Sequence, residues 1–270
     1  MTKILVTGAT RNIGRMVVDE LLAAGADDVR ALTVDPVKAA LPDGVEVARG
    51  FLGRPSTLPA AYADVDVLYL APHLPTVTEA CRLAAEAGIG RIVDLAGPKG
   101  AHWQAVEDAV EACGVPFTHL EPGEFMANAA LWARQIRAGD VVLDTCGDAT
   151  NAPITQEDVA AVAARVLLAD GHLGRSYELT GPEALSRQQK VALIGQALGR
   201  DLRYVDLPRE EAIEELSKDM GSHAAWYIDG QQTLVEHPQQ AVPTVAELTG
   251  RPAETFLSWA RRNVALFQNP

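Results

Sequence analysis

The most constraining feature of this sequence is the segment 3–15, which reads KILVTGATRNIGR. Its apolar run Ile4–Val6 is rich in β-branched residues and predicts a buried strand. A turn of small residues, 7–10, follows, and the apolar spacing after it predicts an amphipathic helix over 12–24. A strand, a glycine turn and a helix in this order are typical of the phosphate-binding start of a dinucleotide fold, because a helix N-terminus attracts a pyrophosphate.

The glycine fingerprint of such a turn is incomplete here. Gly8 and Gly14 are present, but the middle glycine corresponds to Arg11 in one spacing of the fingerprint and to Asn12 in the other. Asn12 can replace a glycine, because Asn adopts positive φ more readily than most residues. Arg11 either blocks the approach of a pyrophosphate or pairs with a phosphate, most usefully the 2′-phosphate of NADP. We favour the second interpretation; the alternative is a turn that survives as scaffold and binds no nucleotide.

Nine residues are predicted to contact the cofactor. They lie in the glycine turn and at the ends of the second and fourth predicted strands. At the end of the second strand, a carboxylate could bond a ribose. They are Thr7, Gly8, Thr10, Arg11, Asn12, Ile13, Gly14, Asp35 and Ala71. NADP(H) is expected rather than NAD(H), and the alternative is that no cofactor binds.

Charge and composition restrict the partners. The formal net charge of −13 argues against nucleic acid and against anionic membrane surfaces, so local charge must attract an anionic cofactor. Three cysteines without C-x-x-C spacing fit reduced thiols in a cytoplasmic protein. No apolar run reaches transmembrane length, and the first predicted strand leaves no room for a signal peptide. We expect a small hydrophobic substrate and consider a homodimer possible.

Strand and helix patterns alternate through the first half of the chain. Strands are predicted over 4–6, 29–34, 45–49, 65–70, 91–95 and 117–121, and helices over 12–24, 76–87 and 102–112. Repeated strand–helix–strand units predict an α/β fold: a doubly wound parallel sheet of the Rossmann type.

After Pro122 the rhythm changes. Helices are predicted over 125–138, 155–169, 186–198 and 256–267, with short strands over 141–143, 177–180 and 202–205. We therefore predict a Rossmann core formed by residues 1–124 and about 150–182. Residues of about 125–149 and 183–270 are predicted to form a small C-terminal α/β cap that binds substrate.

Several stretches together resemble one family. They read ILVTGATRNIGR, ALTVDP, VEVARGFL, GVPFTHLEPGEFMANA, PITQEDVAAVAARVL, YELTGPEALS and LTGRPAETFLSWA. Over nearly its whole length the chain resembles the NmrA-like branch of atypical short-chain dehydrogenases/reductases. The resemblance implies a Rossmann fold and NAD(P)H-dependent reduction of quinones, ketones or isoflavonoids. The same family includes regulators that bind NADP, sense redox state and do no catalysis.

Departures from the family pattern gather where the family handles cofactor. Val34 stands where the family often has an Arg that contacts the 2′-phosphate, and Phe51 where it often has an Asp that bonds adenine. Phe51 could stack on adenine or belong to the core. Arg11 replaces a Gly, and Glu121 replaces an Arg. Membership of the family alone would favour a redox reaction. These departures shift the balance toward a non-redox reaction.

The usual proton-transfer pair of short-chain dehydrogenases is missing, since none of the five tyrosines is followed by Lys four residues later. Candidate acids and bases lie instead just past predicted strands, where open α/β sheets bind ligands. They are His73, Lys99, His102 and Glu121. Each of the first three taken singly is more readily explained as a polar surface residue, but this explanation is weaker for the group, because three strand ends supply its members independently.

Glu121 has two interpretations, as a general acid or base and as a structural partner of Arg134 or Arg137. His119, two residues earlier on the same predicted strand, points to the same face, and we interpret it as a core histidine with a satisfied ring.

A group of residues, mostly aromatic, could line an apolar substrate pocket, although ordinary helix packing explains at least half of the aromatic ones. The group is Trp103, Glu124, Phe125, Met126, Asn128, Trp132, Trp226 and Tyr227. The six histidines show no metal-binding spacing, so no metal site is predicted, and a G-x-S-x-G nucleophile motif is absent.

Three hypotheses for function follow. The first is an NAD(P)H-dependent oxidoreductase of a hydrophobic carbonyl or quinone-type substrate, working without a Tyr-x-x-x-Lys pair. The second is a non-redox cyclase, isomerase or lyase of secondary metabolism, on a scaffold whose cofactor site has degenerated. The third is an NADP-binding redox sensor.

Overall fold

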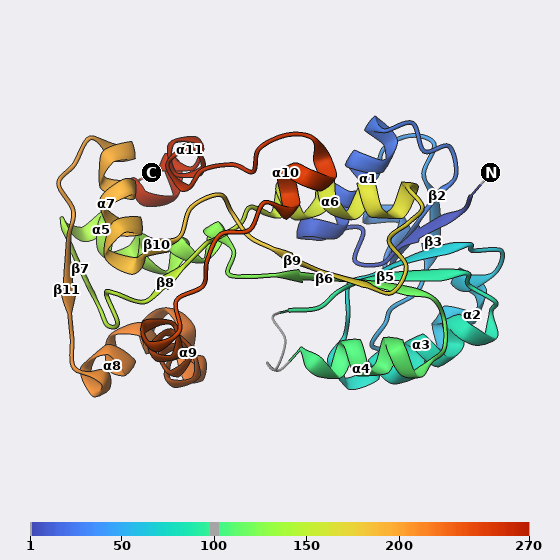
Figure 1. Ribbon diagram of the computed structural model, residues 1–270, viewed down its shortest axis with the longest axis horizontal. Helices are drawn as coiled ribbons and strands as arrows, with labels where there is room; N and C mark the ends of the chain where they lie inside the picture. Colours follow the sequence, from blue (N-terminus) through green and yellow to red (C-terminus); the bar gives the residue numbers. More distant parts are fainter. Residues whose placement is uncertain (1, 98–102, 270) are drawn as a thin grey trace. The chain divides into compact units, whose positions relative to one another are not determined.

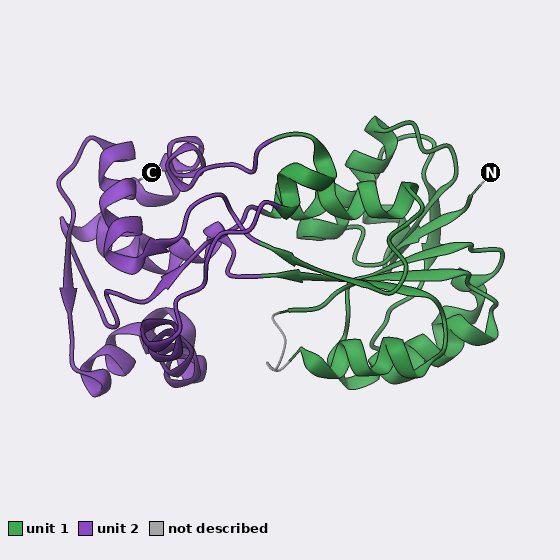
Figure 2. Ribbon diagram, in the orientation of Figure 1, with its two compact units in different colours: residues 1–122, 156–179, 244–251 green, residues 123–155, 180–243, 252–270 purple. Residues whose placement is uncertain are grey.

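A computed structural model describes residues 2–97 and 103–269, which divide into two compact units (Figure 2). Unit 1 comprises residues 1–122, 156–179 and 244–251, and unit 2 comprises residues 123–155, 180–243 and 252–270.

Unit 1 is built on a parallel sheet of seven strands in the order β3-β2-β1-β4-β5-β6-β9 (Figure 1). The strands are β1 (Ile4–Val6), β2 (Val29–Thr33), β3 (Glu46–Arg49), β4 (Val67–Leu70), β5 (Arg91–Leu95), β6 (Phe117–Pro122) and β9 (Arg175–Leu179). From β1 the chain first adds β2 and β3 on one side, and then adds β4, β5 and β6 on the other side of β1. This strand order confirms the predicted doubly wound α/β fold. Because β1 and β4 lie at the centre, all their residues are buried, as their apolar sequences require.

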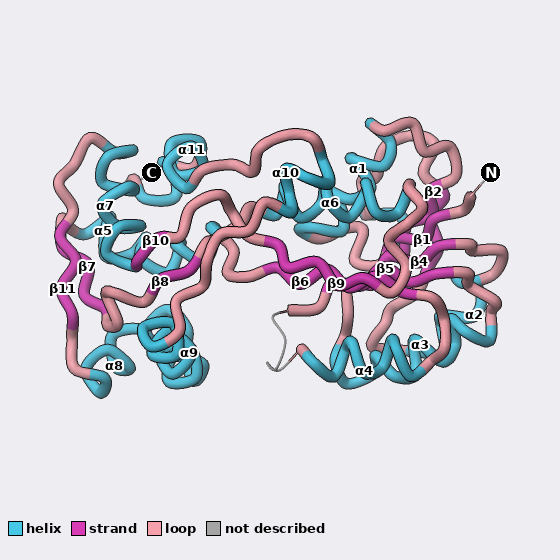
Figure 3. Tube along the Cα trace, in the orientation of Figure 1, coloured by secondary structure: helices cyan, strands magenta, loops and turns pink. Residues whose placement is uncertain are grey.

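Helices cover both faces of this sheet (Figure 3). One layer consists of α1 (Asn12–Ala23) packed on α6 (Gln156–Leu168), with α10 (Thr244–Thr249) against α6. The other consists of α2 (Leu58–Tyr62), α3 (Val77–Glu86) and α4 (Gln104–Ala112). Short 3₁₀ helices, Pro36–Lys38, Pro55–Thr57 and Leu74–Thr76, follow β2, β3 and β4, and each carries a proline in its first turn.

Unit 2 contains two small sheets and several helices around its own apolar core. The strands β7 (Val141–Asp144) and β11 (Arg203–Asp206) pair in parallel, and β8 (Thr150–Asn151) and β10 (Leu185–Ser186) pair antiparallel. The helices are α5 (Ala133–Ala138), α7 (Arg187–Leu198), α8 (Arg209–Met220), α9 (Ala224–Glu236) and α11 (Phe256–Arg262), with 3₁₀ helices Met126–Trp132, Gly221–His223 and Val264–Phe267. A Ser186–Gln189 capping box starts α7.

The structure differs from the sequence prediction at several places. Residues 123–124, 150–155 and 180–182, which the sequence predicts to belong to the core, are part of unit 2. The predicted helix 125–138 is a 3₁₀ helix over Met126–Trp132 that continues as α5, and the predicted last helix becomes 3₁₀ after α11. Residues 244–251 belong to unit 1, not to the cap, because α10 packs on α6 and Arg251 forms an ion pair of 2.9 Å with Asp158. In the described part of the chain, no helix is long and apolar enough to cross a membrane.

Candidate functional site

The turn between β1 and α1 is tightest at its two glycines. Gly8 has φ +65°, and a Cβ there would lie 3.3 Å from the Cβ of Ala71. At Gly14 an added Cβ would come within 2.4 Å of the Gly8 carbonyl oxygen and 2.8 Å of the Thr7 carbonyl oxygen. The first turn of α1 therefore sits directly against the end of β1, which brings the unpaired N–H groups of the helix N-terminus to the turn.

Thr7 ties this turn to β4. Its buried hydroxyl donates to the carbonyl oxygen of Tyr69 at 3.0 Å and accepts the N–H of Ala71 at 2.8 Å. The ends of β1 and β4 are thus held side by side, and Ala71 faces Gly8 across the turn.

The two residues that replace the middle glycine behave differently. Asn12 has φ +23°, which confirms that it takes the left-handed backbone conformation. Arg11 is extended and exposed, at the N-terminal cap of α1. Its guanidinium makes no hydrogen bond or ion pair with any residue between 2–97 and 103–269, so it remains available to an anion.

A cleft of about 350 Å³ opens over the turn, at the carboxyl ends of the central strands. It is lined by residues 8 and 10–14 after β1, 32–34 at the end of β2, 50–52 after β3, and 71–73 after β4, with Leu95 of β5. Arg11 is the one Lys or Arg among these residues, and none of them is an Asp or Glu. The cleft therefore combines an apolar wall with one local cation, although the chain as a whole is strongly acidic.

Asp35 does not line this cleft. Its carboxylate accepts the N–H groups of Val37 and Lys38 at 3.2 and 3.3 Å and caps the 3₁₀ helix after β2. Val34, one residue earlier, lines the cleft and is 58% exposed. The end of β2 thus presents an apolar side chain to the cleft.

His73 forms part of the cleft wall next to Phe51. The two rings meet edge to face, with centroids 5.6 Å apart and an interplanar angle of 65°. The hydroxyl of Thr76 donates to the carbonyl oxygen of Leu52 at 2.8 Å, so its oxygen accepts from His73 Nδ1 at 3.0 Å. His73 is held by these contacts at the β3 side of the cleft.

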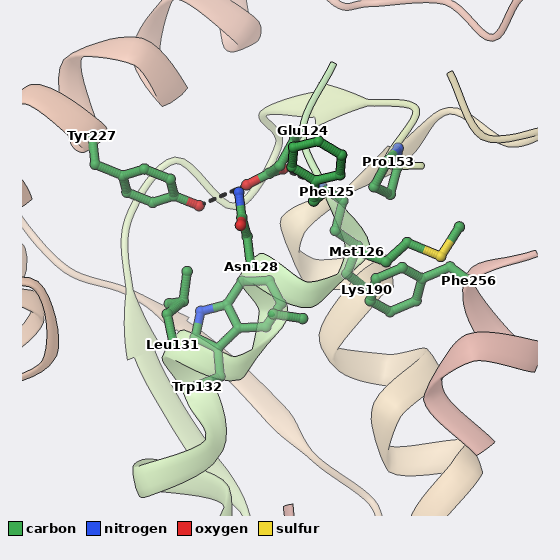
Figure 4. Close-up of a pocket in the computed structure, with 11 residues that line it drawn as sticks. Glu124, Phe125, Met126, Asn128, Leu131, Trp132, Pro153, Lys190, Tyr227 and Phe256 are labelled. Carbon is green, nitrogen blue, oxygen red and sulfur yellow. Dashed lines mark hydrogen bonds and ion pairs between the residues drawn. The ribbon is translucent and has the colours of Figure 1, made fainter. Parts of the chain in front are cut away.

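A second, much smaller cavity lies within unit 2 (Figure 4). Its volume of about 10 Å³ has room for roughly one water molecule. Glu124 stands at its centre: the carboxylate accepts from Tyr227 Oη at 2.9 Å, from Asn151 Nδ2 at 2.6 Å and from Lys190 Nζ at 3.0 Å. Figure 4 shows Asn128 beside the same carboxylate.

The network around Glu124 continues inward from Tyr227. Arg187 donates to the Tyr227 hydroxyl at 2.9 Å and forms a buried ion pair with Asp144. Burial alone would raise the pKa of Glu124, but the positive charges of Lys190 and Arg187 outweigh it and lower this pKa to about 2. Glu124 is therefore ionised at neutral pH in a cluster of two cations and two carboxylates, which suits it to organise unit 2 and not to transfer protons.

Comparison with known proteins now decides the family. The NmrA-like family model matches residues 1–240. The chain belongs to the NmrA-like family. A (4-alkanoyl-5-oxo-2,5-dihydrofuran-3-yl)methyl phosphate reductase of Streptomyces griseus is 36% identical to this NmrA-like protein, over 98% of this chain and 99% of the relative. An NAD(P)H azoreductase of Xenophilus azovorans is 32% identical over the same shares.

Solved structures include a similar fold. The NADPH-dependent quinone oxidoreductase of Escherichia coli superimposes with a TM-score of 0.86 at 26% identity, over 96% of this chain and 98% of that one.

The predicted cofactor residues of this NmrA-like protein come together in the cleft, apart from two. Thr7 lies beneath the turn and acts through its hydrogen bonds, and Asp35 caps a 3₁₀ helix. The cleft-lining members are Gly8, Thr10, Arg11, Asn12, Ile13, Gly14 and Ala71.

The predicted catalytic residues are less gathered. Glu121 is 7% exposed near the carboxyl end of β6, and His73 belongs to the cleft wall. Lys99 and His102 lie outside the described residues. Arg134 pairs with Glu215 and Asp219, and Arg137 donates to the carbonyl oxygen of Ala133.

His119 is a core histidine, as predicted, but its ring is satisfied only at Nδ1: buried Nε2 has no hydrogen-bond partner among the described residues and lies 3.5 Å from a carboxylate oxygen of Glu111. The histidine is 1% exposed, stacks on Phe117 with centroids 4.4 Å apart, and hydrogen-bonds through Nδ1 to Asp94 at 2.6 Å. Burial opposes its charged form, but the bond to Asp94 outweighs burial and raises the pKa of His119.

The predicted substrate residues divide into three groups. Glu124, Phe125, Met126, Asn128, Trp132 and Tyr227 line the small cavity of unit 2, which is too small for a quinone. Trp132 is also core, since it is 2% exposed and donates from its indole to Asp144 at 2.6 Å. Trp226 is 66% exposed, and Trp103 packs against Gly97 after β5, where an added Cβ would lie 2.2 Å from its ring.

Sequence reasoning missed several residues of these sites. Thr33, Gly50, Leu52 and Pro72 of the cleft carry an available signal, since each sits at or just past the end of a predicted strand. Lys190, Arg187, Asn151 and Asp144 of unit 2 carry no local signal, because their partners lie far away in sequence. Among residues 2–97 and 103–269, no three His, Cys, Asp or Glu side chains are grouped as a metal would require.

Proposed function

We propose that this NmrA-like protein is an NAD(P)H-dependent reductase that prefers NADPH to NADH and acts on a small conjugated carbonyl or quinone-type substrate. The cleft over the β1–α1 turn carries the proposal, since it combines a glycine turn with the guanidinium of Arg11, which pairs with none of the described residues. The two relatives from Streptomyces griseus and Xenophilus azovorans support it, because both are named reductases and one is named for its use of NAD(P)H.

The residues of the cleft fit such a cofactor. Because Gly14 has no Cβ, the N-terminus of α1 packs against the end of β1, and a pyrophosphate at this turn would meet the unpaired N–H groups of that helix. Arg11 would hold the 2′-phosphate of NADPH through its planar, multiple-donor guanidinium. Val34 offers no hydrogen bond to a ribose hydroxyl, so the 2′-phosphate contact carries the preference. When bound, the cofactor supplies a hydride.

The substrate class follows from what the relatives reduce. A furanone with an alkanoyl group and a quinone share an electron-poor π system conjugated to a carbonyl, which accepts a hydride. We assign the accompanying proton transfer to Glu121, since it lies near the carboxyl end of β6 and, unlike His73, does not belong to the cleft wall beside Phe51.

Titration calorimetry with NADPH and NADH tests the cofactor, with Arg11→Ala as the decisive variant. Hydrogen bonds to a charged group are worth roughly 1.5–3 kcal/mol, so Arg11→Ala should weaken NADPH binding about 10- to 150-fold and NADH binding less than about 3-fold. Arg82→Ala is the matched control, because it removes one positive charge from α3, away from the cleft.

Turnover then separates a reductase from a sensor. NADPH oxidation with a naphthoquinone or an alkanoyl-furanone phosphate is expected. Tight NADPH binding without turnover of either substrate would favour the redox sensor. Equal loss of NADPH and NADH in Arg11→Ala would reject the assigned role of Arg11, and no binding of either nucleotide would reject the reductase.

A further inference from the structure

Phe51 is a large aromatic side chain that the fold leaves open to the cleft. It is 47% exposed and lines the cleft directly after β3. Its ring is nevertheless fixed: it lies against Gly53, where an added Cβ would come within 2.4 Å of Cε1, and His73 packs edge-on against it. A rigid aromatic surface held open in a binding cleft is suited to receive another flat ring.

The order of the strands indicates which part of a dinucleotide reaches Phe51. The pyrophosphate belongs at the turn after β1, and the adjoining ribose belongs at the end of β2. The next strand beyond β2 is β3, at the edge of the sheet. A base attached to that ribose therefore extends toward the residues that follow β3, of which Phe51 is the largest that lines the cleft.

Hydrogen-bonding groups that could read the amino edge of an adenine are scarce there. The N–H of Phe51 donates to Thr57 Oγ1 at 3.0 Å, and its carbonyl oxygen accepts the N–H of Arg54 at 2.8 Å. The carbonyl oxygen of Leu52 accepts the Thr76 hydroxyl, and His73 donates from Nδ1 to the same hydroxyl, which leaves its Nε2 as an acceptor on this wall. No carboxylate is found among the described residues that line the cleft.

We propose that Phe51 is the platform on which the purine base of the dinucleotide stacks, and that the site recognises the face of the base and not its amino group. His73 and Thr76 are positioning residues that hold the platform. This inference rests on the proposed function, since it describes how the base of the same cofactor is recognised. Its consequence is a tolerance unusual for a nucleotide site: a dinucleotide with hypoxanthine in place of adenine should bind almost as well.

Calorimetric titration of the wild-type protein with NADPH and with nicotinamide hypoxanthine dinucleotide phosphate (reduced) is the first test. The two dissociation constants should agree within about 3-fold. Phe51→Leu keeps an apolar side chain but removes the aromatic face, so it should weaken both ligands about 5- to 150-fold, the range of ~1–3 kcal/mol for base–aromatic stacking. Val37→Ala is the control, because Val37 is 95% exposed on the same unit and does not line the cleft.

Phe51→Trp provides a readout that does not depend on the stability of the leucine variant. It should retain affinity within about 3-fold, and NADP⁺ should quench the added tryptophan fluorescence beyond the change seen in the wild type.

A preference of more than 10-fold for the adenine ligand, unchanged affinity in Phe51→Leu, or no added quenching in Phe51→Trp would overturn the stacking role while leaving the reductase intact. Failure of the wild type to bind any of these dinucleotides would overturn the proposed function itself.

Discussion

Replacing Gly14 by Ala tests the geometry on which the nucleotide site depends. An Ala Cβ at this position would come within 2.4 Å of the Gly8 carbonyl oxygen and 2.6 Å of the Gly8 carbonyl carbon, whereas real Cβ contacts essentially never fall below 3.0 Å. The start of α1 would have to move away from β1 by at least 0.6 Å, the difference between 3.0 and 2.4 Å. Both crowded partners are backbone atoms, so no side-chain rotation relieves the contact.

The expected magnitude combines two opposing terms. Ala is favoured over Gly inside a helix by about 1 kcal/mol, because Gly loses more backbone entropy on folding. Overpacking costs typically ~1–3 kcal/mol, and a clash with backbone belongs at the upper end of that range. Gly14→Ala should therefore lower the free energy of unfolding by about 2 kcal/mol. It should also weaken NADPH more than about 10-fold, because the turn that receives the pyrophosphate is displaced.

Gly230 provides a matched control. It lies inside α9, and an added Cβ there would meet nothing within 4 Å. Gly230→Ala should therefore raise the free energy of unfolding by about 0.5–1 kcal/mol and leave NADPH binding unchanged. Urea unfolding followed by circular dichroism measures both variants. If Gly14→Ala proved as stable as the wild type, or if the two substitutions shifted stability in the same direction, the packing argument would be refuted.

Two further predictions concern carboxylates. Glu121→Gln should reduce turnover about 10²- to 10⁴-fold, the usual worth of general acid–base catalysis, with NADPH affinity within about 3-fold of wild type; unchanged turnover would reject the role. Glu124→Gln should destabilise the protein by roughly 3–5 kcal/mol at pH 7, because it removes the partner of buried Lys190. Since the pKa of Glu124 is lowered to about 2, its stabilisation is full above its unfolded pKa of about 4.5 and is lost as pH falls toward 2. In urea unfolding, the difference in free energy of unfolding between wild type and Glu124→Gln should narrow from pH 5 to pH 2. The control Glu214→Gln, which changes an exposed residue, should show no such difference. A difference for Glu124→Gln that stays constant with pH would contradict the assignment.

The fold could be predicted well from sequence because its signals are local. Strands with continuous apolar runs, such as Ile4–Val6, must be buried on both faces, and a parallel sheet with helices on both sides is the arrangement that provides this. The glycine turn is equally local, since Gly8, Asn12 and Gly14 lie within seven residues and their conformational needs do not depend on distant partners.

The candidate sites could be predicted only in part. Open α/β sheets bind ligands at the carboxyl ends of their strands, and this rule correctly indicated that residues after strands would line a cleft. The rule did not distinguish residues that transfer protons from residues that only form the cleft wall. His73 follows β4 as a catalytic residue would, yet Phe51 and Thr76 hold it against the side of the cleft. Glu124 follows β6 closely in the sequence, yet Lys190 makes it a fixed anion within unit 2.

The sequence by itself determined the strand–helix alternation, the doubly wound sheet, the tight turn and the presence of a cation at that turn. These are properties of neighbouring residues, set by hydrophobic periodicity and by backbone conformations that few residue types adopt. Only the tertiary structure decided what each polar or aromatic side chain contacts: Phe51 open to the cleft, Trp132 buried beside Asp144, and Arg187 joined to Tyr227. Burial and charge pairing depend on chain segments that approach one another only after folding, so no local pattern records them.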